Sequence, residues 1–252
     1  MAQLSSGPRA VGAGSWLIWR ALRGFWRQSL VGDPLSEASL AEALGRFLWG
    51  PLPTLMALAA LTGVIAGISV ASVLEVYDAE LLIIGALYDV LLRQILPLVV
   101  GIFASGSVSV ELASRLGAMS LAREIDALEA MGHDPVPRVL GGPVVAVLAA
   151  SPVHMLLAAL AAFAGAALPL HLSANVAYQG LAHLAVSNAA AQALLTGMAK
   201  ALLFAALAFG VGAVVGSRPV RIPADIGRRA GRAFTTGLLL IFVAAALWTG
   251  LA

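Results

Sequence analysis

Long apolar stretches with few charges occupy most of the chain after about residue 50, and each is typical of a membrane-crossing helix. An α-helix needs about 20 apolar residues to span the ~30 Å hydrocarbon core of a bilayer. Stretches of that length predict five spans, which cover residues 51–74, 81–106, 139–168, 189–215 and 233 to the C-terminus. The predicted fold class is therefore an all-α membrane protein of about five transmembrane helices.

An amphipathic pattern precedes the first span. Over residues 17–30, the arginines (Arg20, Arg23 and Arg27) fall on one helical face, opposite an apolar face formed by Ile18, Trp19, Leu22, Phe25 and Trp26. This pattern predicts a helix in the membrane interface, with tryptophans at headgroup depth and arginines toward anionic lipid. A second amphipathic stretch, 36–49, leads into the first span. We therefore expect residues 1–50 to form a cytoplasmic and interfacial region, and residues 51–252 to form the membrane domain.

The composition supports a membrane protein and excludes several kinds of site. Of 252 residues, 60% are hydrophobic and only 11% are charged, which is too little charge to cover a soluble domain of this length. The chain has no cysteine, so disulfides and thiolate metal sites are excluded. The histidines lack ligand spacing, and His154 is expected to be a packing residue. No metal and no cofactor are predicted.

The basic residues give the expected orientation. The connections after the first and third spans contain no Lys or Arg. The connections after the second and fourth spans contain Arg115, Arg123, Arg138, Arg218, Arg221, Arg228, Arg229 and Arg232. Because basic loops stay in the cytoplasm, the N-terminus is predicted inside and the C-terminus outside. The basic residues are thus interpreted as determinants of membrane orientation and not as a nucleic-acid-binding surface.

The connection after the second span predicts a short cytoplasmic helix over about 120–132. Ser120 is the expected N-cap, Leu121, Ile125 and Leu128 form an apolar stripe, and acidic residues lie off that stripe. Gly132 is expected to end the helix, and Pro135 to prevent its resumption. Such a helix could transmit movement from an ATPase to the spans, or it could be an inert surface helix. The periodicity of the sequence does not distinguish between these two roles.

Several motifs resemble the MlaE permease family. The run 124–135 reads E-I-D-A-L-E-A-M-G-H-D-P and is similar to the family signature E-I-D-A-L-x-x-M-G-x-D-P. The run 91–97, L-L-R-Q-I-L-P, is similar to the family's L-L-R-E-L-G-P, with Gln94 in place of its glutamate. Lys200 falls where the family carries a lysine in the fourth span. Residues 226–236 are similar to its G-x-A-T-T element.

The resemblance implies a permease that works in pairs in the bacterial inner membrane. Its implied partners are a second permease chain, cytoplasmic ABC ATPase subunits and periplasmic MCE-domain proteins, and its implied cargo is phospholipid or a related lipid. No G-x-x-x-x-G-K-[ST] motif occurs in the chain, so ATP hydrolysis is expected in the partner. The implied ATPase-coupling residues are Glu124, Asp126, Leu128, Glu129, Met131, Asp134 and Pro135.

Ionisable residues within the spans form a second candidate site. A charge at bilayer depth costs at least ~2.5–3.5 kcal/mol, so it needs a partner or a function. Asp89 and Arg93 are one helical turn apart and can pair with each other. Lys200 has no acidic neighbour on its own helix, so its partner must lie on another span or be a ligand. Asp89, Arg93, Gln94 and Lys200 are the candidate lipid-binding residues; a purely structural ion pair is the alternative.

Rival classes find less support in the sequence. An intramembrane enzyme would need a nucleophile with its base, or a metal-binding pair, and no H-E-x-x-H motif is present. A secondary transporter usually shows inverted repeats and more spans. A non-transporting scaffold or heterodimer-partner subunit remains an alternative.

Small residues at Gly63, Gly67 and 158–167 predict close helix packing.

Overall fold

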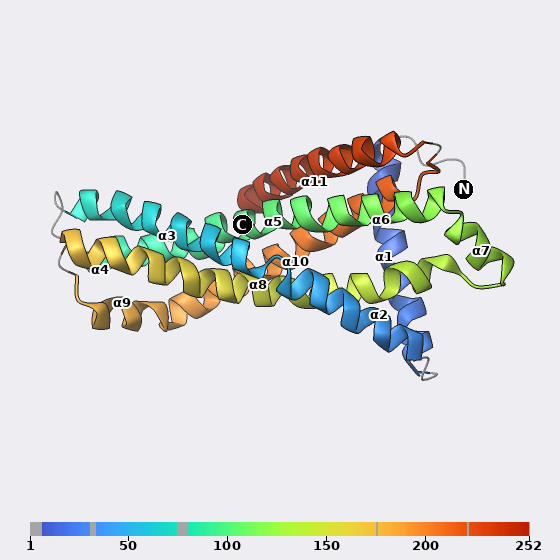
Figure 1. Cartoon of the computed structure of the whole chain (residues 1–252). Coiled ribbons are helices and arrows are strands. Elements are labelled where there is room, and N and C mark those ends of the chain that lie inside the picture. The colour runs from blue at the N-terminus through green and yellow to red at the C-terminus, as the bar shows by residue number, and fades with distance from the viewer. Residues whose placement is uncertain (1–6, 31–33, 75–79, 175, 221, 252) are drawn as a thin grey trace. The chain divides into compact units, whose positions relative to one another are not determined.

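The computed structural model describes residues 7–30, 34–74, 80–174, 176–220 and 222–251, and the regular elements of these ranges are all helices (Figure 1). In the described ranges, five helical stretches are long and apolar enough to cross a membrane: Ala38–Leu74, Ile83–Leu121, Pro135–Ser173, Asn188–Gly216 and Ala224–Gly250. The predicted all-α fold with five spans is confirmed.

The helices are α1 (Gly7–Leu30), α2 (Pro34–Leu44), η1 (Gly45–Trp49), α3 (Leu52–Leu74), α4 (Glu80–Val90), η2 (Leu91–Ile95), α5 (Leu96–Ala104), η3 (Ser105–Ser109), α6 (Val110–Leu121), α7 (Glu124–Ala130), α8 (Pro135–Ala174), α9 (Tyr178–Ala185), α10 (Asn188–Gly216) and α11 (Ala224–Leu251). The elements η1, η2 and η3 are π-helical turns. Several helices extend beyond the predicted ends of their spans. The second continues past residue 106 as α6, and the fifth begins at Ala224 and not at 233.

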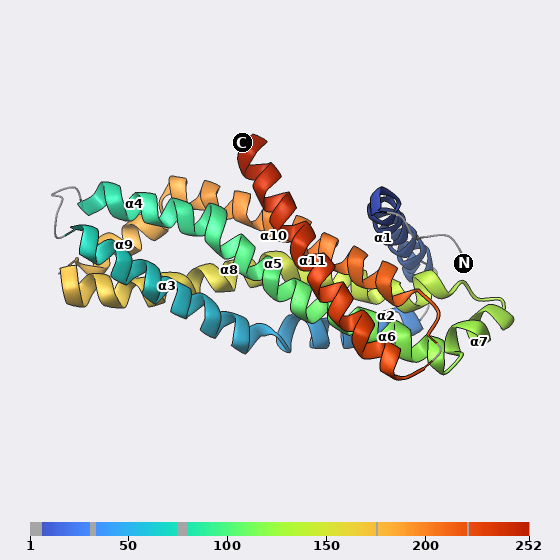
Figure 2. The same cartoon turned by 90° about the horizontal axis from the view of Figure 1, so that it is seen from above.

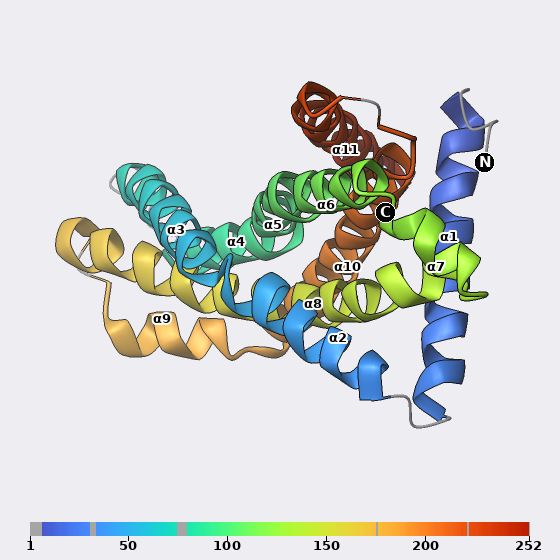
Figure 3. The same cartoon turned by 45° about the vertical axis from the view of Figure 1, so that its right-hand side comes forward.

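The chain forms two compact units, and each is described by itself. Unit 1 comprises Met1–Gly50, Gly101–Ala150 and Leu202–Ala252; unit 2 comprises Pro51–Val100 and Ser151–Ala201. In unit 1, α6 packs along α11 (Figures 1 and 3). In unit 2, α3 packs along α4 (Figure 2). Because α8 and α10 cross the unit boundaries, both helices contribute to both units.

The first helix buries one side in unit 1 and exposes its tryptophans. Ala13, Leu17, Ala21 and Phe25, spaced by four residues, are buried in the unit. Trp19 and Trp26 are exposed, as their predicted place at the membrane interface requires. The prediction that Phe25 lies on the same face as Trp19 and Trp26 is wrong, because its position on the four-residue stripe turns it toward the protein. The helix thus has a protein face as well as an exposed aromatic one.

Small residues bring α3 and α8 into backbone contact in unit 2. A Cβ atom on Gly63 would collide with the carbonyl of Ala162, and a Cβ on Gly165 would collide with the carbonyl of Ala60. One turn along, a Cβ on Gly67 would lie 2.7 Å from the Ala166 carbonyl oxygen. The predicted close packing of small residues is therefore confirmed.

Two π-helical turns interrupt the second span. In a π turn the N–H group bonds to the carbonyl five residues back, and such turns occur often at functional positions. The Leu96 N–H bonds in this way to the Leu91 carbonyl and closes η2. In η3, the buried Ser105 hydroxyl donates to the Phe234 carbonyl of α11 at 3.0 Å. The second span is therefore wider than a regular helix at these two positions.

Candidate functional sites

The short helix predicted after the second span is α7, and it begins later than expected. It runs from Glu124 to Ala130 and lies at the joint between α6 and α8 (Figures 1 and 2). Arg123 precedes it in the left-handed conformation, with φ 58° and ψ 24°. Non-glycine residues seldom adopt this conformation, and the helix is interrupted at Arg123. The break separates α7 from the span before it.

The predicted N-cap is wrong. Ser120 lies inside the last turn of α6, because the second span continues as a helix through Leu121. Its hydroxyl accepts a hydrogen bond from the Val220 N–H at 3.3 Å and ties α6 to the segment before α11. Leu121 also belongs to α6, so it is not part of the apolar stripe of α7.

The predicted C-terminal stop at Gly132 is confirmed. Gly132 has φ 76°, and its N–H bonds to the Glu129 carbonyl at 3.0 Å. The His133 N–H bonds to the Leu128 carbonyl, also at 3.0 Å. This pair of bonds is the Schellman motif, in which a left-handed glycine satisfies the last carbonyls of a helix.

Pro135 lies beyond the end of α7, which does not resume, and a separate helix begins there. It is the first residue of α8, a position that proline favours because its missing N–H is not needed there. Asp134 caps the same helix, since its Oδ1 accepts the Val136 N–H at 3.1 Å. Its Oδ2 accepts a hydrogen bond from Arg20 of α1 at 2.7 Å. Both oxygens of this predicted coupling residue are therefore engaged within the chain.

The outward side of α7 is acidic. Glu124, Asp126 and Glu129 are exposed, whereas Ile125 and Leu128 are partly buried. Leu128 packs against the core of unit 1. The predicted coupling residue Met131 is exposed just beyond the helix. The apolar side of α7 thus packs against unit 1, and its opposite side exposes three carboxylates.

The intramembrane polar residues come together in unit 2. Arg93 Nε donates to Asp89 Oδ1 at 2.5 Å, and these side chains are 36% and 50% exposed. The predicted pairing one turn apart is confirmed. Gln94 follows in the same π turn and is also exposed. Exposed polar groups at bilayer depth need water, another chain or a polar ligand beside them.

Lys200 lies behind this π turn and is only 4% exposed. Its Nζ donates to the Arg93 carbonyl at 2.8 Å and to Gln94 Oε1 at 3.2 Å. Of the two predicted alternatives for its partner, another span or a ligand, the structure shows the first. Four residues after Arg93 the chain has Pro97, which lacks an N–H. The Arg93 carbonyl therefore has no regular α-helical donor, and the lysine of α10 supplies one.

A glycine allows α10 to come close enough for this bond. A Cβ atom on Gly197 would lie 2.5 Å from the Leu92 carbonyl oxygen and 2.6 Å from Met155 Cε. Gly197 is about one turn before Lys200, so the same close approach brings the lysine to the Arg93 carbonyl. Within the described ranges, no cluster of three or more His, Cys, Asp or Glu residues could hold a metal ion.

Sequence reasoning missed three ion pairs in unit 1. Arg20 was expected to face lipid, yet it pairs with Asp134, which is 114 positions away in the chain. Arg46 of η1 bonds to Glu111 of α6 at 3.1 Å and also to Glu42. The i,i+4 spacing of Glu42 and Arg46 could have found the second bond. No local pattern marks the two long-range pairs.

Five helical stretches in the described ranges, each long and apolar enough to cross a membrane, define the class: this is a multi-pass α-helical membrane protein. The sequence profile of the family described as permease MlaE matches residues 40–251. The chain therefore belongs to the MlaE permease family. A search of curated proteins finds no match.

Proposed function

We propose that this chain is the membrane-spanning subunit of an ABC-type transporter that moves phospholipids or related lipids between the inner membrane and the outer envelope. Membership in the MlaE permease family supports this assignment. Energy comes from a separate cytoplasmic ATPase subunit. A second permease chain and a periplasmic MCE-domain protein complete the complex. The protein itself carries out no catalysis.

The observation that carries the proposal is the placement of α7. It connects two membrane helices through a left-handed break at one end and a Schellman motif at the other. Leu128 anchors it to unit 1, so a push on α7 reaches the beginning of α8. The exposed carboxylates of Glu124, Asp126 and Glu129 would complement a basic groove on the ATPase. We infer that α7 is the coupling helix.

The cluster in the second span supplies the polar part of the lipid path. Arg93 and Gln94 are the donors that can meet a lipid phosphate, since both lie in the π turn and neither is buried. A guanidinium is suited to phosphate oxygens. Lys200 is a positioning residue in this proposal: it holds the Arg93 carbonyl and fixes the direction of the turn. Asp89 holds the Arg93 side chain between lipid contacts.

Charge reversal on α7 tests the coupling proposal. Glu124→Lys combined with Asp126→Lys should reduce copurification of the ATPase subunit by roughly tenfold or more, because two attractive contacts become repulsive. Lipid transfer should fall with it, while the amount of permease in the membrane should not change. Copurification from detergent extracts and a lipid-transfer assay in proteoliposomes give the two readings.

Asp225→Lys is the matched control. Asp225 lies in the first turn of α11, pairs with Arg228 and lies on the same predicted side of the membrane. This reversal should leave ATPase association intact. Equal loss in both proteins, or no loss in the α7 variant, would refute the coupling role of α7.

A further inference from the structure

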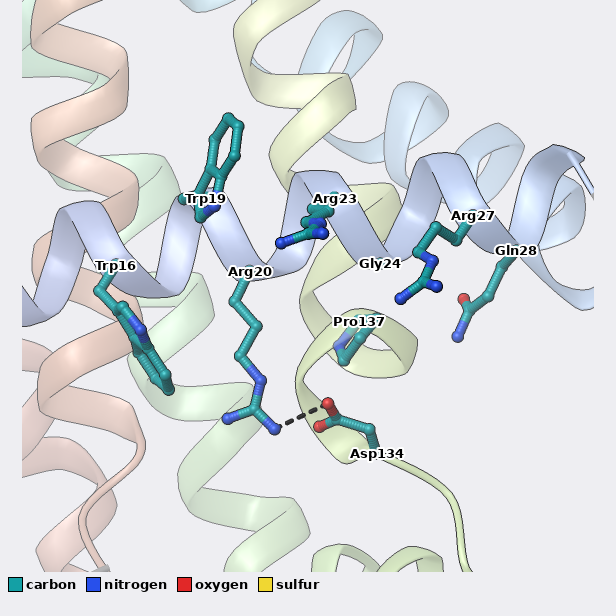
Figure 4. Close-up of a pocket in the computed structure, with 9 residues that line it drawn as sticks. All are labelled: Trp16, Trp19, Arg20, Arg23, Gly24, Arg27, Gln28, Asp134 and Pro137. Atoms are coloured by element: carbon teal, nitrogen blue, oxygen red, sulfur yellow. Dashed lines mark hydrogen bonds and ion pairs between the residues drawn. The ribbon is translucent and has the colours of Figure 1, made fainter.

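A groove of about 570 Å³ lies in unit 1 between α1 and the beginning of α8 (Figure 4). It is lined on α1 by Trp16, Trp19, Arg20, Arg23, Gly24, Arg27 and Gln28, and on the α8 side by Asp134 and Pro137. A Cβ on Gly24 would collide with the Pro137 ring, so the glycine allows α1 to rest directly on the start of α8. The candidate coupling helix and the polar cluster of unit 2 take no part in this groove.

The groove has an excess of positive charge. It contains three arginines and one aspartate. The aspartate, Asp134, is paired with Arg20 at 2.7 Å, and Arg20 also lies over the Trp16 ring at 5.1 Å. Arg23 and Arg27 are exposed and four residues apart on the helix, a spacing at which like charges repel. An anion between them would turn this repulsion into attraction.

The aromatic residues place the groove at a membrane surface. Trp16 and Trp19 are 53% and 64% exposed at its edge. Tryptophan is enriched where the hydrocarbon meets the headgroups. Figure 4 shows Arg20, Arg27 and Gln28 pointing to the same side of α1 as Pro137 and Asp134, while Trp19 points to the other side. The arginines of α1 can bind the phosphate of a phospholipid, and its exposed tryptophans can lie beside the acyl chains.

We propose that this groove binds the headgroup of an anionic membrane phospholipid, with the phosphate between Arg23 and Arg27. Their guanidinium groups can each donate two parallel hydrogen bonds to phosphate oxygens, and the Gln28 amide can donate to a neighbouring headgroup oxygen. The exposed Trp16, which points to the same side of α1 as Arg20 in Figure 4, adjoins the glycerol and upper acyl region. The bound lipid stays in its leaflet beside α1, so it is distinct from the lipid that the proposed transporter moves.

Spin-labelled lipids provide a direct test. The full-length protein is placed in nanodiscs of phosphatidylcholine and phosphatidylglycerol, and electron paramagnetic resonance measures the motionally restricted fraction of each labelled lipid. The wild-type protein should prefer labelled phosphatidylglycerol. Arg23→Gln with Arg27→Gln should weaken that preference by about fivefold for each arginine, as expected for basic residues at an anionic surface.

Two further variants separate the site from general charge. Arg228→Gln with Arg232→Gln removes two exposed arginines, also four residues apart, from α11 outside the groove. This control should keep the preference for phosphatidylglycerol. Arg23→Lys with Arg27→Lys keeps the charge and should retain part of the preference. Circular dichroism and gel filtration check folding, and the lysine pair provides the comparison if the glutamine pair does not fold.

Three outcomes would overturn the proposal. They are an unchanged preference in the groove variant, equal loss in the groove and control variants, and displacement of labelled lipid by inorganic phosphate at matched ionic strength. The last result would assign the groove to a free anion. The experiment needs no ATPase and no transport. A negative result would therefore not contradict the proposed function, and a negative result in the α7 coupling test would not contradict lipid binding in the groove.

Discussion

At the scale of single residues, Lys200 gives the sharpest expectation. Lys200→Met keeps an unbranched side chain, one atom shorter, but removes the hydrogen bonds to the Arg93 carbonyl and to Gln94. We expect a loss of about 1 kcal/mol in unfolding free energy, typical of an interhelical hydrogen bond in a membrane protein. Denaturant unfolding in mixed micelles measures this loss.

Pro97→Ala provides the control for that expectation. The alanine restores an N–H four residues after Arg93, so the carbonyl regains a donor of its own helix. Lys200→Met should therefore cost less in the Pro97→Ala background than in the wild type. A double-mutant cycle measures the coupling between the two positions. Additive costs would show that the lysine does not substitute for the missing helical donor.

Some of this site could be predicted from the sequence, because its causes are local. The spacing of Asp89 and Arg93 predicted their ion pair, and the lack of an acidic neighbour limited the partner of Lys200 to another span or a ligand. The choice of a main-chain carbonyl as that partner depends on Pro97 and on the packing of α10. The Arg20–Asp134 pair depends wholly on tertiary structure.

At the scale of elements, both ends of α7 hold a residue in a conformation that favours glycine. Gly132 and Arg123 both have positive φ values, which cost an L-residue with a Cβ about 1–2 kcal/mol. Gly132→Ala should therefore lower stability by about 1 kcal/mol. Arg123→Gly should leave stability unchanged or raise it slightly. Thermal unfolding midpoints in detergent check both, and a Gly132→Ala protein as stable as the wild type would contradict the role of the Schellman motif.

Hydrophobicity predicted that the spans exist but did not predict where their helices end. A bilayer limits the apolar stretch, whereas a helix can continue into water as long as its hydrogen bonds are made. This is why α11 begins among charged residues at Ala224, and why the second span continues through α6. The N-cap preference of Ser120 was overridden by the continuing helix, and Pro135 opened a helix because Asp134 caps it.

At the scale of the whole molecule, the orientation in the membrane remains a prediction from loop charge. The chain has no cysteine, so single cysteines can be labelled without background. Met131→Cys and Val186→Cys replace residues that are 63% and 82% exposed. With the N-terminus inside, a membrane-impermeant maleimide should label position 186 in spheroplasts, and position 131 only after permeabilisation. The reverse pattern would place α7 outside and remove its access to an ATPase.

The bond from Lys200 to the Arg93 main chain has a consequence for movement in unit 2. Because the acceptor is a backbone atom, no rotamer change of Arg93 can release it. The flexible four-carbon stem of Lys200 can follow a slide of α10 by one residue, ~1.5 Å along its axis, but not a slide of many residues. Any cycle that keeps this bond must therefore hold α10 within reach of the lysine side chain from the π turn, and larger movements have to be absorbed by other joints.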